Sequence, residues 1–171
     1  MEGNPTMSIL LFLLFLLLFA LPVALGLSKL FKKAGEAGWK GFVPIYNLVI
    51  MLRLIGRPAS WAWAICGNYL FTFVWSLLRG DVNSDLYRVI YISLSVLSFV
   101  FLVRAFFTLS YSYGKDGVFT VWLVILPFVF FPVLGYGKSR YEGPFGDPDA
   151  YDAFQAGLNG SFDFEHDILA N

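Results

Sequence analysis

The chain has 171 residues, of which 58% are hydrophobic and only 14% are charged, and its mean hydropathy is +0.68. Soluble domains carry about 25% charged residues, so this composition leaves too little polar surface for a soluble protein. Its twelve basic and twelve acidic side chains give a net charge of zero. The single cysteine, Cys66, excludes an intramolecular disulfide. We therefore expect an all-α, polytopic membrane protein.

The first apolar run, residues 8–28, contains no charged side chain. About 20 consecutive apolar residues are enough to span a bilayer. A cleaved signal peptide is the alternative interpretation, because the sequence ALG near the end of the run resembles a cleavage site. The run is longer than the roughly 7–15 residues of a signal-peptide core, and no Lys or Arg precedes it. A retained transmembrane helix is the prediction.

A basic, glycine-rich stretch follows at residues 32–47, with Gly35, Gly38 and Gly41 at every third position. It lacks the Lys-Ser/Thr spacing of a phosphate-binding loop, which also follows a strand, so we expect a tight turn out of the first helix instead. Residues 42–56 are too short to cross the roughly 30 Å hydrocarbon core as a helix. They predict a short interfacial or re-entrant helix, with Pro44 at its start.

Three further apolar runs predict helices at about 59–78, 86–113 and 118–136, which gives three to four transmembrane helices in total. Pro127 and Pro132 interrupt the last run, so a bent or re-entrant segment is an alternative to a full crossing. Asn68 is expected to hold helices together. It shares its helix with a stripe of small residues, and two serines of the next helix are expected to pack opposite that stripe. These small residues are Ser60, Ala64 and Gly67, with Ser95 and Ser98 opposite.

Basic side chains are concentrated between the first helix and residue 58, where Glu36 is the one acid. The excess of positive charge places this loop in the cytoplasm and the N-terminus outside. Four crossings would put the C-terminal tail outside, whereas Lys138 and Arg140 favour a cytoplasmic tail. A re-entrant last segment resolves this conflict, and we expect the tail to be cytoplasmic. The residues expected to contact anionic lipid headgroups are Lys29, Lys32, Lys33, Lys40, Arg53 and Arg57.

The inventory of reactive side chains argues against an enzyme. No Asp or Glu lies inside an apolar run, and the one histidine is His166, in the tail. A carboxylate dyad, an intramembrane haem site and an HExxH zinc site are therefore unsupported. Arg88 and Arg104 are expected to bound one hydrophobic stretch, with Arg88 able to pair with Asp85. We expect no catalytic residue, no metal and no cofactor, and a small oligomeric channel or transporter is the alternative.

Residues 141–171 form an acidic-aromatic tail that follows the membrane domain of residues 1–140. The tail carries seven acidic side chains and no Lys or Arg. Asp147 and Pro148 predict the start of a short helix that ends at Gly157. The acid spacing does not match an EF-hand. The tail docks on a basic partner or on the basic loop of its own chain, or it is simply solvated. The residues expected to dock are Tyr151, Phe154, Phe162, Phe164, Ile168 and Leu169.

Residues 33–63 carry a specific pattern, Lys-Ala-Gly-x-x-Gly-Trp, then Pro-Ile-Tyr-Asn, then Gly-x-Pro followed by tryptophans. On these residues the chain resembles a family of small bacterial polytopic membrane domains without an assigned activity, over roughly residues 8–144. Related domains also precede the catalytic part of some bacterial signal peptidases I. The structural motif residues are Gly35, Gly38, Trp39, Pro44, Tyr46 and Asn47. The remaining matches are Lys33, Ala34, Ile45, Gly56, Pro58, Trp61 and Trp63.

The resemblance implies a multi-pass protein of the bacterial inner membrane whose domain ends in the cytoplasm. It does not imply peptidase activity here, because only about 30 residues follow the membrane region and no lysine lies beyond Lys138. The sequence therefore predicts an accessory or scaffold subunit of a larger membrane complex. Its partners would be the lipid bilayer and one or more membrane proteins. We expect no nucleic-acid partner, and the sequence identifies no small-molecule substrate.

Overall fold

The computed structural model describes residues 5–78, 82 and 84–157, and every regular element in this part of the chain is a helix. The all-α prediction is confirmed. Two helices, Met7–Lys33 and Asp85–Ser112, are long and apolar enough to cross a membrane, fewer than the three to four that we expected. The difference arises because the helix of the second run has only 17 residues and the last run is broken into two short helices.

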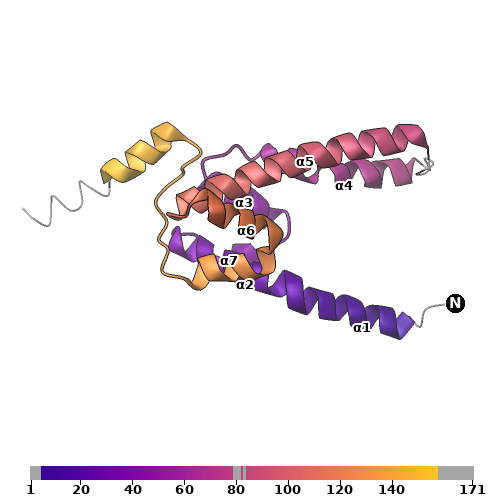
Figure 1. Cartoon of the computed structure of the whole chain (residues 1–171), viewed down its shortest axis with the longest axis horizontal. Coiled ribbons are helices and arrows are strands. Elements are labelled where there is room, and N and C mark those ends of the chain that lie inside the picture. Colours follow the sequence, from indigo (N-terminus) through magenta and orange to yellow (C-terminus); the bar gives the residue numbers. More distant parts are fainter. Residues whose placement is uncertain (1–4, 79–81, 83, 158–171) are drawn as a thin grey trace, which may run out of the picture.

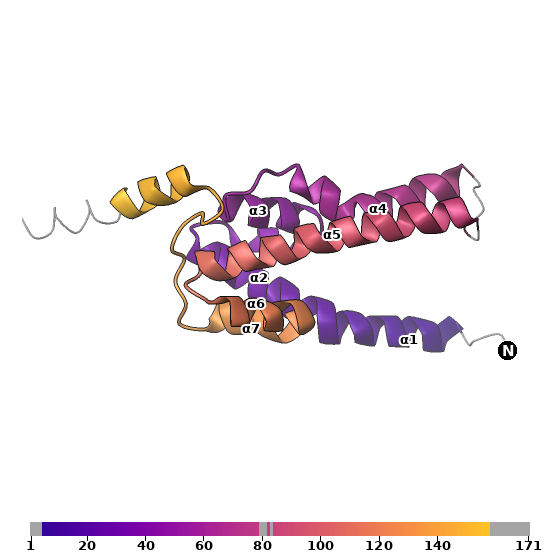
Figure 2. The ribbon, with the colours of Figure 1, turned by 45° about the horizontal axis from the view of Figure 1, so that its top comes forward.

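The first run forms one continuous rod of α1 (Pro5–Phe15), a π-helical turn (Leu16–Ala20) and α2 (Leu21–Lys33). It continues five residues beyond the expected end at Ser28. In both ribbon views α1 projects away from the helices that cover α2 (Figures 1 and 2). Its leucines are more than half exposed, for example Leu11 at 58%. Such an apolar surface is stable only against lipid or another apolar partner.

Three helices end in the same way and on the same side of the molecule. They are α2, α3 (Tyr46–Leu54) and α5 (Asp85–Ser112). Each is followed by a glycine with positive φ, and the next amide donates to the carbonyl five residues back, which is the Schellman motif. The glycines are Gly35, Gly56 and Gly114, with φ of +81°, +72° and +64°. The hydrogen bonds are Glu36 N to Phe31 O, Arg57 N to Leu52 O and Lys115 N to Ser110 O, at 2.8–2.9 Å.

Residues 38–57 enter the molecule and return to the side from which they came. The 3₁₀ turn η2 (Gly38–Phe42) runs back along α2, so closely that a Cβ on Gly41 would lie 2.6 Å from the Ser28 nitrogen. The chain then reverses at Ile45, and α3 leads out again. This α3 begins at Tyr46, so the expected start at Pro44 was two residues too early.

The last apolar run also turns back on itself, between α6 (Gly117–Ile125) and α7 (Pro127–Tyr136). The Phe130 ring lies 5.3 Å from Phe119 and 6.1 Å from Trp122. Phe119 and Phe130 would be roughly 16 Å apart along a straight helix, so their contact requires the two segments to fold together. The break falls at Leu126, directly before Pro127, where a continuing helix would lose a hydrogen bond.

The helix α7 packs along α2 with both chains running in the same direction. The rings of Phe19 and Phe128 are 4.9 Å apart, and the Lys29 ammonium lies 5.2 Å from the centre of the Tyr136 ring. Between these contacts a Cβ on Gly135 would lie 2.6 Å from the Gly26 carbonyl oxygen. The two glycines therefore allow the backbones to meet.

The helices α4 (Trp61–Leu77) and α5 form an antiparallel hairpin. The Ser98 hydroxyl donates to the Ala64 carbonyl at 2.8 Å, so the expected contact of this serine with the small-residue stripe is present. At the start of α5, Arg88 pairs with Asp85 at 3.6 Å, as expected. This hairpin projects in the same direction as α1 (Figure 2).

The buried core lies on the opposite side, where α2, α3, α5 and α7 end. Residues 141–147 cross this end of the molecule. The Glu142 amide donates to the Ser112 carbonyl, and the Gly146 amide donates to the Ile55 carbonyl, both at 2.8 Å. A further helix, 148–157, follows, and the Asp147 carboxylate caps it by accepting from the Ala150 amide at 3.3 Å. The first half of the tail is therefore attached to the membrane domain.

Candidate functional site

The Pro-Ile-Tyr-Asn motif contains the one non-glycine residue with positive φ in the described part of the chain, Ile45, with φ of +65° and ψ of −49°. The Tyr46 amide donates to the Pro44 carbonyl at 2.7 Å, which closes a γ-turn around Ile45. A β-branched residue in this conformation costs roughly 1–3 kcal/mol, and such strain collects at binding and switching sites. Ile45 is therefore a candidate position for a binding site.

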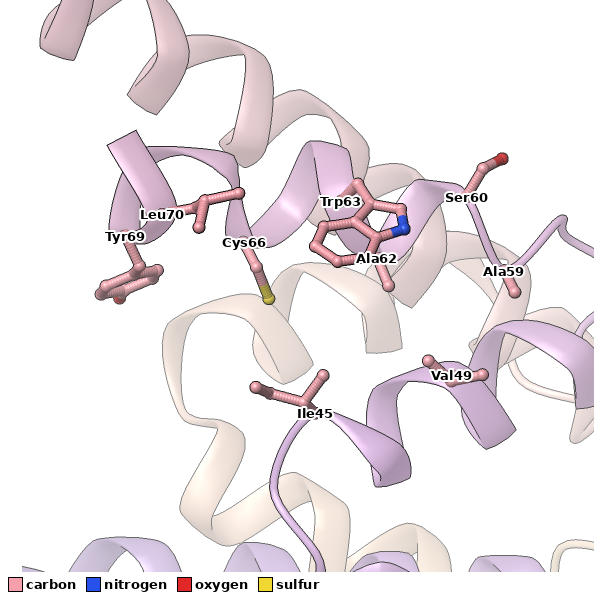
Figure 3. A pocket seen from close by; sticks show the side chains of 9 residues that line it. All are labelled: Ile45, Val49, Ala59, Ser60, Ala62, Trp63, Cys66, Tyr69 and Leu70. Atoms are coloured by element: carbon pink, nitrogen blue, oxygen red, sulfur yellow. The ribbon is translucent and has the colours of Figure 1, made fainter. Parts of the chain in front are cut away.

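An apolar groove of about 530 Å³ opens beside this turn, between α3 and α4 (Figure 3). Pockets of roughly 300–1,000 Å³ are typical of ligand sites. The residues that line the groove from α4 recur at helical spacing, so they lie on one face of that helix. The side chain of Cys66 points from α4 towards Ile45 across the groove. The lining residues are Ile45, Val49, Ala59, Ser60, Ala62, Trp63, Cys66, Tyr69 and Leu70.

The groove combines large exposed side chains with two small ones on α4, Ala62 and Cys66. Ile45, Trp63 and Tyr69 are 67%, 70% and 75% exposed, whereas Ala62 is 7% exposed. Small residues on one helix face let another apolar segment approach the backbone closely. The arrangement suits an apolar segment held between two rings.

A second pocket of about 400 Å³ lies on the other side of the same turn, against the first helix. Pro44 and Asn47 line it from the motif, and Phe19 and Ala20 line it from the π-helical turn. π-helical turns frequently occur at functional sites. The irregular backbone of the π-helical turn and that of the motif therefore meet at one pocket. Inside a membrane, irregular backbone is tolerated only where it lines a cavity or is buried in protein.

The motif residues divide between structure and surface. Gly35 lies at the turn out of α2, and Gly38 and Trp39 lie in η2, with Trp39 61% exposed and stacked on Tyr46 at 6.1 Å. The Asn47 side-chain amide donates to the Gly41 carbonyl at 3.3 Å and so ties α3 to η2. The motif therefore fixes the conformation of residues 38–57.

Several of the basic residues expected at lipid headgroups have protein partners. The Lys33 ammonium donates to the carbonyls of Leu134 and Gly137 at 2.7 and 2.9 Å, and so satisfies the end of α7. Lys40 pairs with Glu36, and the hydrogen bond to this carboxylate raises the pKa of Lys40. Lys33 therefore has a structural role that the sequence did not reveal.

The other basic candidates differ in their surroundings. Lys29 lies over the Tyr136 ring, and the Lys32 side chain lies against Gly38. Arg53 is exposed on α3. The Arg57 guanidinium lies 5.0 Å from the centre of the Trp61 ring. Contact of these residues with lipid headgroups stays a prediction.

Two docking candidates of the tail contact their own chain. The Tyr151 ring lies 5.9 Å from Phe145, and the Phe154 ring lies 5.5 Å from Tyr141. Tyr141 in turn donates to the Leu54 carbonyl at the end of α3. Burial raises the pKa of Tyr141 to about 12. The other docking candidates, Phe162, Phe164, Ile168 and Leu169, lie outside the described residues.

Within residues 5–78, 82 and 84–157, no three His, Cys, Asp or Glu side chains gather closely enough to hold a metal ion. His166 lies outside these residues. No sequence motif marks the groove residues Ala62, Trp63, Cys66 and Tyr69 as a site. Their recurrence on one face of a helix was visible, but the same pattern is expected of any lipid-facing helix.

Comparison with known proteins gives a family but no activity. No curated protein and no solved structure matches the chain. A family model matches residues 39–144, from the second residue of η2 to the segment that crosses the ends of α3 and α5. The match includes the strained turn, the groove and the helix pair α6–α7. The chain belongs to this family, which is described as a family of unknown function (DUF5684).

Proposed function

We propose that the chain is a non-catalytic, integral membrane subunit that binds an apolar segment of a partner membrane protein in the groove between α3 and α4. The observation that carries the proposal is the pairing of a strained turn at Ile45 with an apolar groove whose α4 side includes the small residues Ala62 and Cys66. These small side chains leave room for an apolar segment, and Trp63 and Tyr69 supply amphipathic anchors of the kind enriched at interfaces.

The membrane arrangement that supports this function has three crossings. The rod Met7–Lys33 and α5 run in the same direction, and α4 returns the chain between them. With 17 residues, α4 is at the short end of the roughly 17–25 residues that span a bilayer. Residues 38–57 and α6–α7 enter and leave at the end that carries Lys33, Lys115 and Lys138. By the positive-inside rule this end is cytoplasmic, so the N-terminus is outside and the tail inside.

The resemblance to domains that precede signal peptidase I fits a binding module better than an enzyme of its own. In those proteins the related domain precedes the catalytic part. The location in a bacterial inner membrane rests on the same resemblance.

Site-specific photo-crosslinking in native membranes tests the proposal. A photoreactive amino acid replaces Trp63 in the full chain, and the matched control carries it at Ile92 on α5. The two side chains are similarly exposed, at 70% and 61%. We expect one defined protein adduct from position 63 and none from position 92, with the adduct lost when Cys66→Trp fills the groove. Adducts with lipid alone at both positions would overturn the proposal.

A small oligomeric channel is the alternative, and one observation favours it. A pocket of about 510 Å³ on the α4–α5 hairpin includes the polar side chains of Asn68, Thr72, Ser76 and Tyr87. Polar side chains on a lipid-facing surface can line a path between copies. Ion flux through the purified protein in liposomes, abolished by Asn68→Leu, would favour the channel over the binding subunit.

A further inference from the structure

Two arginines from distant parts of the chain line one cavity at the basic end of the molecule. Arg57 follows α3, and Arg104 lies on α5. Together with Val103, Phe107 and Thr108 they line a cavity of about 370 Å³. Arginine forks bind phosphate oxygens in a bidentate manner, so two of them on one cavity form a strong anion site.

Neither arginine of this cavity forms an ion pair with another described residue. The ion pairs among the described residues are Lys40–Glu36 and Arg88–Asp85, and neither includes Arg57 or Arg104. Two guanidinium groups on one cavity without an ion-pair partner favour an anionic ligand.

The guanidinium of Arg57 is held in place from two sides. It lies 5.0 Å from the centre of the Trp61 ring. On the other side the backbone of Gly146 passes so closely that a Cβ there would lie 2.8 Å from Nε. This fixation reduces the entropy lost when a ligand binds.

The position of Arg104 places the cavity at the level of lipid phosphates. Its side chain is exposed although it lies on a membrane-crossing helix. Arg88 and Arg104 are 16 residues apart, roughly 24 Å along a helix, so they bound most of the roughly 30 Å hydrocarbon core. The side chains of Val103 and Phe107, the latter 44% exposed, continue the cavity with an apolar wall.

From these contacts we propose that Arg57 and Arg104 form a binding site for the phosphate group of an anionic phospholipid. The cationic part receives the phosphate, and Val103 and Phe107 receive the start of an acyl chain. The same guanidinium chemistry would bind free phosphate, which lacks an acyl chain and gains nothing from the apolar wall. The site is independent of the groove between α3 and α4.

The test uses the full-length protein in detergent. It is titrated with phosphatidylglycerol and with phosphatidylcholine, and bound lipid is counted by native mass spectrometry. We expect one tightly bound phosphatidylglycerol and weaker phosphatidylcholine. Arg104→Gln should weaken phosphatidylglycerol binding by about tenfold or more, because a charge-assisted hydrogen bond is lost. The matched control is Arg88→Gln, in an arginine at the other end of α5 whose side chain is 60% exposed and does not line the cavity. It should leave phosphatidylglycerol binding unchanged.

Two further measurements distinguish lipid from free phosphate and control for misfolding of the variant. Inorganic phosphate that displaces the lipid from the wild-type protein at millimolar concentration would assign the site to free phosphate and overturn the lipid proposal. Arg104→Lys keeps the charge without the bidentate fork, so an intermediate loss is expected, and this variant serves if Arg104→Gln does not fold. Equal lipid binding by wild type, Arg104→Lys and Arg104→Gln would also overturn the proposal.

Discussion

At the residue scale, Ile45 determines the shape of the candidate site. Its side chain is 67% exposed, so burial contributes little to keeping an isoleucine there. The γ-turn nevertheless holds it at positive φ, with Pro44 fixing the preceding residue and α3 beginning directly after it. The strain is sustained by the packing of η2 and α3 on either side.

Replacing Ile45 by Gly and by Ala tests this strain. Both variants remove the same exposed side chain, but only glycine adopts positive φ without steric cost. We expect the glycine variant to be more stable than the alanine variant by about 1 kcal/mol, measured by thermal unfolding in detergent. At an unstrained position alanine is the more stable of the two by about 0.4–1 kcal/mol, so that order at Ile45 would contradict the strained turn.

Tyr141 connects the tail to the end of α3 through its hydroxyl, which donates to the Leu54 carbonyl. Burial raises its pKa to about 12 in the folded protein, above about 10 in the unfolded chain. The folded state therefore favours the protonated phenol. Its contribution to stability is complete below pH 10 and is lost as the pH rises from 10 through 12.

The variant Tyr141→Phe separates this contribution from the aromatic packing. At pH 8 we expect it to be less stable than wild type by about 0.5–1.5 kcal/mol, the usual contribution of one hydrogen bond. The difference should shrink between about pH 10 and pH 12, followed by chemical denaturation at each pH. A difference that stays constant across this range would show that the phenol does not ionise in the way its burial implies.

At the element scale, the contact between α2 and α7 depends on two glycines facing each other. A Cβ on Gly135 would lie 2.6 Å from the Gly26 carbonyl oxygen, so the helices must separate to accommodate alanine. Membrane helices associate through such close packing because lipid supplies no hydrophobic force between them.

Gly135→Ala should destabilise the protein by about 1–3 kcal/mol, as overpacking does in other cores. Gly67→Ala on α4 is the matched control, because nothing lies within 4 Å of a Cβ at that position. The control should be neutral or stabilising by up to about 1 kcal/mol, since alanine is the better helix former. Thermal unfolding of both variants checks the pair, and equal effects would contradict the close contact.

The sequence predicted the existence of the helices better than the residues at which they end. The charge-free run 8–28 and the long run 86–113 each became a helix because apolar length alone decides them. The turn at Leu126 was foreseen as an alternative through Pro127, which has a local steric cause. The end of the first helix was not foreseen, because Lys32 and Lys33 looked like loop residues, whereas the helix includes both and ends at Lys33.

At the scale of the whole molecule, the candidate groove could not have been predicted. It depends on Ile45 taking a positive φ, and isoleucine normally favours extended backbone. It also depends on α3 returning beside α4, which is a tertiary contact between segments that no local pattern encodes. Likewise, Arg57 and Arg104 line one cavity although they are 47 positions apart, so no local sequence pattern connects them.

Both proposals depend on one property of the whole molecule, which is that α6–α7 enters and leaves on the same side as the basic loops. In the orientation proposed above, this geometry would place the groove and the arginine cavity in the inner leaflet. It would also let a chain with an outside N-terminus end inside after three crossings.

Cysteine accessibility in sealed membrane vesicles tests this property most directly. In a Cys66→Ala background, single cysteines replace Val82, Lys115, Ile125 or Lys138, and a membrane-impermeant maleimide is added from one side or the other. We expect Lys115 and Lys138 to be labelled from the same side, Val82 from the opposite side, and Ile125 from neither. Labelling of Lys115 and Lys138 from opposite sides would mean that α6–α7 crosses the membrane, and would contradict the account.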